Sequence, residues 1–121
     1  MNTIKILSIV LITVFFISCG DSQTSSENAI NTKLEHAMVK VWGNCGMCKK
    51  TIEASIADME GLSVGKWDVD KKVLHVEFDS TKTSLDKISL AVAGSGYDTE
   101  FHTASDDAYN GLHSCCQYDR K

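Results

Sequence analysis

Two pairs of closely spaced cysteines are the side chains of this sequence best suited to chemistry. Cys45 and Cys48 are separated by two residues, and Cys115 and Cys116 are adjacent. A Cys-x-x-Cys motif at the start of a helix lets both sulfurs converge on one point, and the positive end of the helix lowers the thiol pKa. Lys49 adds positive charge directly behind the first pair. Because thiolates without a harder ligand nearby favour Cu(I), Zn(II) or Hg(II), Cys45 and Cys48 predict a soft-metal site.

The same motif also serves thiol–disulfide oxidoreductases, which are the main alternative from the enzyme class. Thioredoxin-like enzymes place a cis-proline against the two sulfurs, whereas this chain contains no proline. We therefore expect a binding protein that catalyses no reaction. In oxidising surroundings a disulfide between Cys45 and Cys48 is an alternative resting form of the metal-free protein.

The C-terminal segment, residues 104–121, carries a second group of candidate ligands. His113, Cys115 and Cys116 place three soft or borderline donors within a stretch of four residues. About 11 residues lead to Cys115 and span up to about 35 Å if extended, which is enough to reach the first cysteine pair. We hypothesise that one or more of these side chains completes the site and gives it three or four ligands. A vicinal disulfide and a separate weak site are the two alternatives.

Hydrophobic periodicity predicts the elements that hold the first cysteine pair. A short apolar and β-branched run, Ala37–Trp42, predicts a strand before the pair. Behind the pair, apolar residues at Ile52, Ile56 and Met59 predict one face of a helix that stops at Gly61. The motif therefore lies between a strand and the start of a helix.

Three further strands and a second helix complete the pattern. The strands are predicted at residues 62–70, 73–79 and 97–103. The first of them is expected to contain a bulge or loop between Val64 and Trp67, and Ser84 is the expected N-cap of the second helix. The order β-α-β-β-α-β over residues 36–103 predicts an α+β, ferredoxin-like domain, in which two helices cover one face of a four-stranded antiparallel sheet.

The N-terminal residues predict targeting and anchoring. Residues 1–18 combine a short basic start with an apolar run that is too short to cross a bilayer comfortably. The run ends in a small residue before Cys19, which resembles the lipobox of bacterial lipoproteins, where the cysteine is acylated and becomes the mature N-terminus. Residues 19–35 predict a flexible tether. We expect a lipid-anchored protein that faces the periplasm from the inner or outer membrane; a non-cleaved anchor and an ordinary secretion signal are the alternatives.

Composition and charge limit the partners. The chain is 43% hydrophobic and 23% charged, which is ordinary globular composition, and its net charge is −4. An acidic body without a basic stripe argues against nucleic acid. It suits a cationic ligand or a protein partner with a basic docking face. We expect a monomer.

The segment from Ala37 to Phe101 resembles the heavy-metal-associated domain family, which includes copper chaperones, the N-terminal domains of metal-pumping ATPases and the periplasmic mercury-binding protein. The matching residues are Cys45-x-x-Cys48 with Ile52-Glu53 and Ile56, the strand Val73–Asp79, and Lys87-Ile88 leading to Gly96-Tyr97-Asp98.

This resemblance implies a role for the matching residues. In the family, the two cysteines bind one ion in an exposed, near-linear site and pass it to a partner by ligand exchange, so Cys45 and Cys48 inherit this role. Tyr97 matches an aromatic residue that lies beside the metal loop. The family usually has Met where this chain has Gly43, and we expect Met47 to compensate partly. We therefore expect binding of Cu(I), or of Hg(II) or Zn(II) in a variant of the same module, and exchange with a metal efflux or transport protein outside the cytoplasm.

Overall fold

A three-stranded antiparallel sheet forms the base of the protein in the computed structural model, which describes residues 32–121. The strands are β1 (Leu34–Lys40), β2 (Leu62–Asp68) and β3 (Val73–Asp79), and the central strand β3 pairs with both others. The predicted strands at residues 37–42, 62–70 and 73–79 are thus confirmed, with shifted ends. The predicted signal peptide, and the predicted tether up to residue 31, lie outside the described residues.

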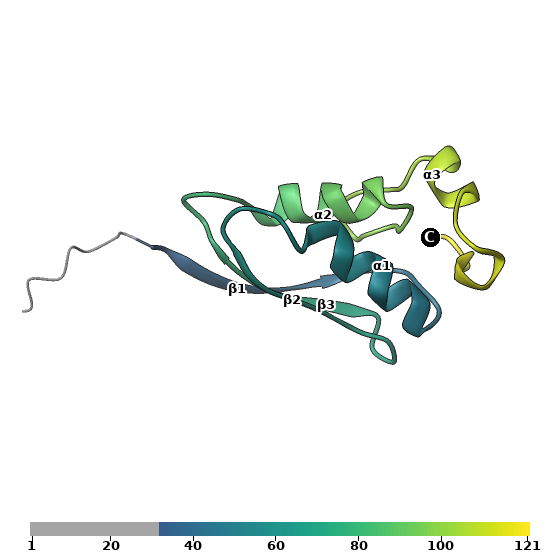
Figure 1. The fold of residues 1–121 in the computed structure, drawn as a ribbon, viewed down its shortest axis with the longest axis horizontal. Helices are drawn as coiled ribbons and strands as arrows, with labels where there is room; N and C mark the ends of the chain where they lie inside the picture. Colours follow the sequence, from purple (N-terminus) through teal and green to yellow (C-terminus); the bar gives the residue numbers. More distant parts are fainter. Residues whose placement is uncertain (1–31) are drawn as a thin grey trace, which may run out of the picture.

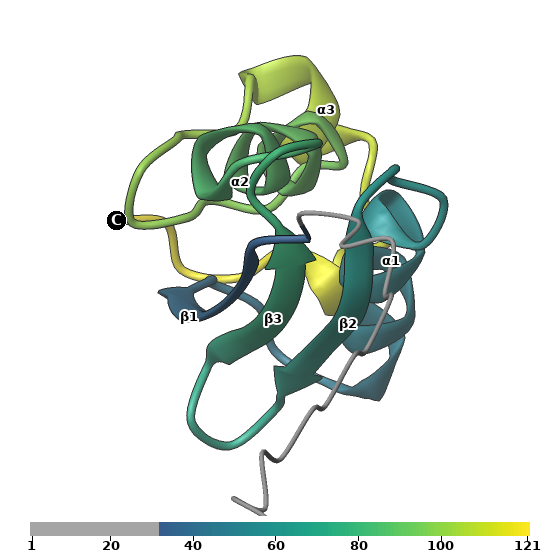
Figure 2. The same cartoon turned by 90° about the vertical axis from the view of Figure 1, so that its left-hand side faces the viewer.

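Two helices cover one face of this sheet, as predicted. They are α1 (Gly46–Ile56) and α2 (Leu85–Gly94), and they lie next to each other on the same side of the sheet (Figures 1 and 2). The fold is therefore α+β, with a single helix layer on a single sheet. The buried apolar side chains between the two layers include Val39, Ile52, Ile56, Trp67, Leu74, Val76, Phe78, Ile88 and Val92.

The ends of the two helices follow their local chemistry. The Ser84 hydroxyl oxygen accepts a hydrogen bond from the backbone N–H of Lys87, which confirms Ser84 as the N-cap of α2. Helix α1 ends at Ile56 rather than at Gly61. The N–H of Met59 bonds to the Ile56 carbonyl, so the backbone tightens into turns before it enters β2.

The strand β2 contains the expected irregularity, but earlier than predicted. Its register against β3 shifts between Leu62 and Val64 rather than between Val64 and Trp67. Gly65 follows directly, and a Cβ atom there would stand 2.7 Å from Cδ1 of Ile56. The irregular strand and the glycine together let β2 lie close against α1.

The prediction of a fourth strand at residues 97–103 is wrong. Within the described chain, Thr99 alone pairs with the β1 side of the sheet there, through a single bridge to Val41. The Thr99 hydroxyl oxygen then accepts hydrogen bonds from the N–H groups of Phe101 and His102. These local bonds turn the backbone, so the ladder cannot extend past the bridge.

The tail, residues 104–121, returns to the end of the domain where α1 begins. It contains the short helix α3 (Asp106–Asn110) and the 3-10 helix η1 (Ser114–Cys116). In Figure 1 the tail is the light green to yellow segment beyond α1 and α2. None of the helices among residues 32–121 is both long and apolar enough to cross a bilayer.

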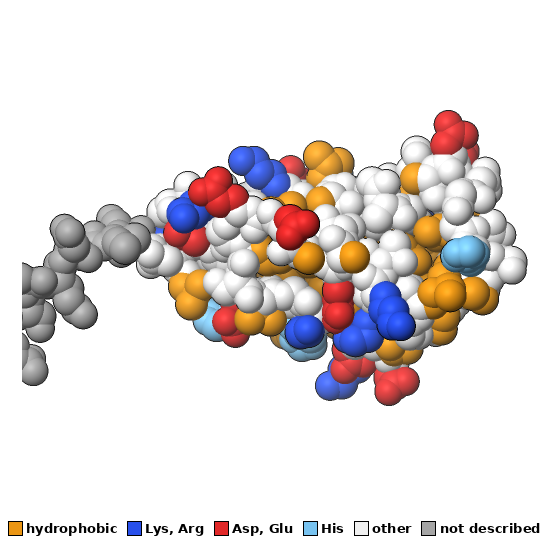
Figure 3. Space-filling model, in the orientation of Figure 1, with side chains coloured by type: hydrophobic (Ala, Val, Ile, Leu, Met, Phe, Trp, Pro, Cys, Tyr) orange, Lys and Arg blue, Asp and Glu red, His pale blue; other side chains and the backbone are white. Residues whose placement is uncertain are grey.

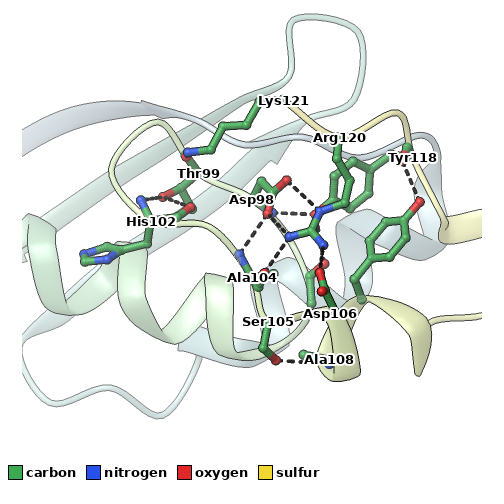
Figure 4. A network of polar contacts seen from close by, with 12 residues as sticks. Asp98, Thr99, His102, Ala104, Ser105, Asp106, Ala108, Tyr118, Arg120 and Lys121 are labelled. Atoms are coloured by element: carbon green, nitrogen blue, oxygen red, sulfur yellow. Dashed lines mark hydrogen bonds and ion pairs between the residues drawn. The ribbon is translucent and has the colours of Figure 1, made fainter.

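An ion pair to the buried Asp98 carboxylate and a buried tyrosine fasten this tail to the domain (Figure 4). The Arg120 guanidinium lies 3.1 and 3.0 Å from the two carboxylate oxygens of Asp98. Burial opposes ionisation of Asp98, but the hydrogen bonds from Arg120 outweigh it and hold the pKa of Asp98 below its ordinary value. The Tyr118 hydroxyl accepts a hydrogen bond from the Asp98 N–H at 2.6 Å and donates one to the Gly96 carbonyl at 2.9 Å.

Candidate metal centre

Cys45 and Cys48 lie where β1 gives way to α1, as the sequence predicted. Cys45 is the N-cap residue of α1, and Cys48 lies in its first turn with a fully buried side chain. Their sulfur atoms are 3.9 Å apart. The backbone N–H of Asn44 donates to the Cys48 sulfur at 3.3 Å. The loop before the helix thus points both sulfurs toward one location.

Gly43 adapts this loop to a tryptophan. A Cβ atom at Gly43 would stand 2.9 Å from the Trp67 ring and 3.3 Å from Cβ of Cys48. The Trp67 ring is buried and donates its indole N–H to the Val41 carbonyl. Met47, which was expected to compensate partly, is 48% exposed and so does not occupy this space. Trp67 fills the space beside the loop instead.

The tail brings a third sulfur to this point. The sulfur atoms of Cys45, Cys48 and Cys116 all lie within 4.8 Å of one another. Cys116 is buried, and it lies at the end of η1, just before the anchored residues Tyr118 and Arg120. The Asn44 side-chain amide also donates to the Gln117 carbonyl at 3.3 Å, which ties the metal loop to the tail.

The other candidate ligands of the tail lie outside this group of sulfurs. Cys115 is exposed, and its sulfur lies 3.9 Å from that of Cys116 and 3.7 Å from the Met47 sulfur. His113 is the exposed residue before η1. All four cysteines in the described part of the chain are free thiols.

Tyr97 packs against the sulfurs with its hydroxyl group. Its side chain is fully buried, and its ring stacks on the Tyr118 ring with 5.7 Å between centroids. The hydroxyl faces Cys48 and Cys116, and it has no hydrogen-bond partner of good geometry among residues 32–121. A buried, unpaired O–H beside three thiols is in place to donate to a thiolate.

The electrostatic surroundings of the three thiols differ. The backbone N–H groups of Cys48 and Met47, at the start of α1, lower the pKa of the Cys45 thiol. Burial, together with the neighbouring Cys48, raises the pKa of the Cys116 thiol to about 12. Cys45 is therefore the readiest to become a thiolate, while Cys116 keeps its proton at neutral pH unless a cation replaces it.

Lys49 does not join this site. Its ammonium group forms an ion pair with Glu53 at 2.6 Å and donates to the Trp67 carbonyl. The charge of Lys49 therefore stabilises the contact between α1 and β2 rather than a thiolate.

The sulfur geometry fits a soft metal ion. A planar site with three thiolates and metal–sulfur bonds of about 2.3 Å separates its sulfurs by about 4 Å. The 3.9 Å between Cys45 and Cys48, with Cys116 within 4.8 Å of both, is close to this arrangement. With one sulfur from the tail and a buried hydroxyl at its back, the site is more enclosed than a two-cysteine loop.

Several residues that build this site were missed by sequence reasoning. They are Asn44, which joins the loop to the tail, and Asp98, Tyr118 and Arg120, which fasten the tail. The signal that could have indicated this docking was the aromatic content of the tail, since Tyr109 and Tyr118 are side chains that usually pack against another part of the protein.

Known proteins resemble this chain over the part that contains the cysteine loop. The pattern of the heavy-metal-associated domain family matches residues 44–98. The copper chaperone CopZ of Bacillus subtilis (strain 168) is 30% identical over 66 residues, which is 54% of this chain and 96% of that protein. The periplasmic component of the mercuric transport protein of Shigella flexneri is 34% identical over 53 residues, 44% of this chain and 58% of that protein.

The likeness extends to solved structures. Oxidized MerP from Ralstonia metallidurans CH34 superimposes with a TM-score of 0.53 at 29% sequence identity, over 55% of this chain and 94% of that chain. Such relatives are named for carrying metal ions and not for catalysing reactions. The chain belongs to the heavy-metal-associated domain family.

Proposed function

We propose that this protein binds one soft metal ion, Cu(I) in the first place, between Cys45, Cys48 and Cys116, and carries or sequesters it outside the cytoplasm. The observation that carries the proposal is the convergence of three free thiol sulfurs within 4.8 Å at the start of α1. Soft thiolates select Cu(I) and Hg(II) over hard cations.

A second candidate cargo is Hg(II). It is favoured by the likeness to a mercuric transport protein and by the third sulfur, which a thiophilic ion can use. Zn(II) fits less well, because closed zinc sites take four protein ligands and three donors converge among residues 32–121.

The binding step follows from the state of the thiols. The lowered pKa of Cys45 favours its thiolate, so Cys45 is ready to bind an ion that reaches the site. Cys48 is the second ligand, and Cys116, which is protonated at neutral pH, binds with loss of its proton. The Tyr97 hydroxyl, which faces the Cys48 and Cys116 sulfurs, donates a hydrogen bond to a thiolate of the loaded site.

Titration of the reduced protein tests the proposal. Under anaerobic conditions and thiol competition, Cu(I), Hg(II) and Zn(II) are added to the full chain and to variants, which ranks the metals. Cys45→Ser should abolish tight binding, and Cys116→Ala should weaken it by about tenfold or more, since one metal–sulfur bond is lost. Urea unfolding of the metal-free variants serves as the control for folding. Unchanged affinity in Cys116→Ala would remove the tail from the site, and unchanged affinity in Cys45→Ser would end the proposal.

Proton release gives an independent test of the third ligand. Because the Cys116 thiol has a pKa of about 12, it is protonated at pH 7 and loses that proton when it binds the ion. Metal binding should therefore release about one proton more from the natural chain than from Cys116→Ala, and its affinity should rise more steeply with pH. Equal proton release from both proteins, measured with a pH indicator, argues against Cys116 as a ligand.

The proposal includes a cellular location and a class of protein partner. Cys19, acylated as in bacterial lipoproteins, would anchor the chain in the cell envelope, and the tether would hold a monomeric domain in the periplasm near a metal transport protein. Incorporation of labelled palmitate into the natural chain, and its loss in Cys19→Ser, tests the anchor. Transfer of Cu(I) to an isolated metal-binding domain of an efflux ATPase tests the partner class.

A further inference from the structure

Two exposed sulfur atoms lie just outside the three-thiol site. The Met47 sulfur is 3.7 Å from the Cys115 sulfur, and the side chains come from opposite sides of the site, the first turn of α1 and the helix η1. Met47 is 48% exposed and Cys115 is exposed as well. A thioether and a thiol in contact at the surface form a pair of soft donors.

This pair is continuous with the buried site. The Cys115 sulfur lies 3.9 Å from the Cys116 sulfur, which in turn lies within 4.8 Å of Cys45 and Cys48. The sulfurs of Met47, Cys115 and Cys116 thus form a continuous row of soft donors from the surface to the three-thiol site. The 3.7 Å between Met47 and Cys115 and the 3.9 Å between Cys115 and Cys116 are short enough for one ion to bind two neighbouring sulfurs at the same time, since metal–sulfur bonds of about 2.3 Å reach across about 4 Å.

The burial of two thiols of the site limits how a partner protein can reach them. Cys48 and Cys116 are 0% and 2% exposed, so the ligands of a donor protein cannot touch these sulfurs while the tail is docked. An ion that moves by ligand exchange must keep a ligand at every step. It therefore needs a donor that is both accessible to the partner and adjacent to the buried thiols. Half-buried Cys45 meets this requirement on the loop side of the site, and exposed Cys115 meets it on the tail side.

We propose that Met47 and Cys115 form a transfer site on the tail side, through which a soft metal ion passes between a partner protein and the three-thiol site. This inference rests on the proposed function of Cys45, Cys48 and Cys116. The surface around the pair suits such a contact, because hydrophobic side chains gather at the end of the molecule formed by the tail and the start of α1, with a histidine beside them (Figure 3).

The transfer balances without an oxidant or reductant. A metal–sulfur bond to Cys115 forms as a bond to the donor breaks, and the Cys115 proton goes to the thiolate that the donor releases. Met47 adds a neutral thioether ligand during this step. The ion then exchanges Cys115 for Cys116, and the proton of Cys116 passes to Cys115, which becomes a thiol again. The metal keeps its oxidation state throughout, and release follows the same steps in reverse.

Kinetics separate a transfer site from a ligand of the loaded state. The probe is Cu(I) complexed with bathocuproine disulfonate, mixed anaerobically with the full chain in detergent, with Cys19→Ser in every protein so that no other thiol competes. Met47→Leu and Cys115→Ser should slow uptake and release by about fivefold or more each, since each removes a sulfur contact from the transfer intermediate. Their equilibrium affinities should stay within about twofold of the parent protein, because the loaded site is intact. Met38→Leu is the matched control, as Met38 is 68% exposed within β1, where it lies opposite His75 of β3, and its rates should not change.

The outcomes are distinguishable from those of the proposed function. Parent-like rates in both variants would overturn the transfer site and leave the three-thiol site standing. A loss of affinity in Cys115→Ser would also overturn it, because Cys115 would then be a ligand of the loaded state. Failure of the parent protein itself to bind Cu(I) would instead contradict the proposed function.

Discussion

Replacing Tyr118 by Phe should destabilise the domain far more than the loss of one oxygen atom suggests. The Tyr118 hydroxyl serves two backbone groups at once, accepting from the Asp98 N–H at 2.6 Å and donating to the Gly96 carbonyl at 2.9 Å. Both hydrogen bonds are buried. Tyr118→Phe keeps the ring stacked on Tyr97, so the change isolates the two hydrogen bonds.

The size of the effect follows from the groups left behind. A buried donor or acceptor that loses its partner costs about 1–3 kcal/mol, so two of them should lower the free energy of unfolding by about 3 kcal/mol. Tyr109→Phe is the matched control. The Tyr109 hydroxyl makes one hydrogen bond, to the half-buried carbonyl of Tyr118, and its loss should cost about 1 kcal/mol.

Urea unfolding of the metal-free proteins, followed by circular dichroism, measures both losses. The slope of the free energy against urea concentration should stay the same, since the folded surface does not change. Equal, small losses for Tyr118→Phe and Tyr109→Phe would refute the reasoning, because they would mean that water or a shifted backbone satisfies Asp98 and Gly96 without the tail.

Three further predictions concern the stability of the metal-free protein. Arg120→Met leaves the buried Asp98 carboxylate without its ion pair, so the urea midpoint should fall about three times further than for Asp106→Ala, whose carboxylate is 89% exposed. Since the pKa of Asp98 is lowered by folding, its contribution to stability is present above the unfolded pKa of about 3.9 and is lost as pH falls through the lower folded value; urea midpoints between pH 7 and pH 3 should fall less for Asp98→Asn. Gly43→Ala places a methyl group 2.9 Å from the Trp67 ring and should cost about 1–3 kcal/mol in thermal or urea unfolding, and less when Trp67 is replaced by Phe.

The elements that depend on local pattern could be predicted from the sequence. Strand β3 alternates buried Leu74, Val76 and Phe78 with outward residues, and Ser84 marks the start of α2. The position of the Cys-x-x-Cys motif between a strand and a helix follows from the same periodicity. These features need no information about distant contacts.

The prediction of a fourth strand failed because side chains nearby in sequence and in space take the backbone hydrogen bonds of this segment. Residues 97–103 have a composition compatible with a strand, but the Thr99 hydroxyl binds the next turn and the Asp98 N–H is bound by Tyr118. Neither bond has a periodic signature. A side chain that competes for backbone hydrogen bonds decides the conformation there.

The length of the tail could be predicted to reach the cysteine loop, but its binding position could not. Spacing shows that Cys116 can arrive at the cysteine loop, and it cannot show which of His113, Cys115 and Cys116 would. The choice is made by contacts directly after η1, from Asn44 to the backbone of Gln117 and from Tyr118 to the domain. Such contacts join residues about 20 to 70 positions apart, which no local pattern encodes.

A metal ion bound by Cys116 as well as by the cysteine loop would also cross-link the chain. Cys45 and Cys116 are 71 positions apart, so an ion held by both closes a long loop of the chain as a disulfide would. Closing a loop of this length removes unfolded-chain entropy worth about 4 kcal/mol. Unlike a disulfide, this cross-link disappears when the ion is passed on. The metal-free protein is therefore the form more readily unfolded and cleaved by a protease, and the resistance of a molecule to cleavage would report whether it is loaded.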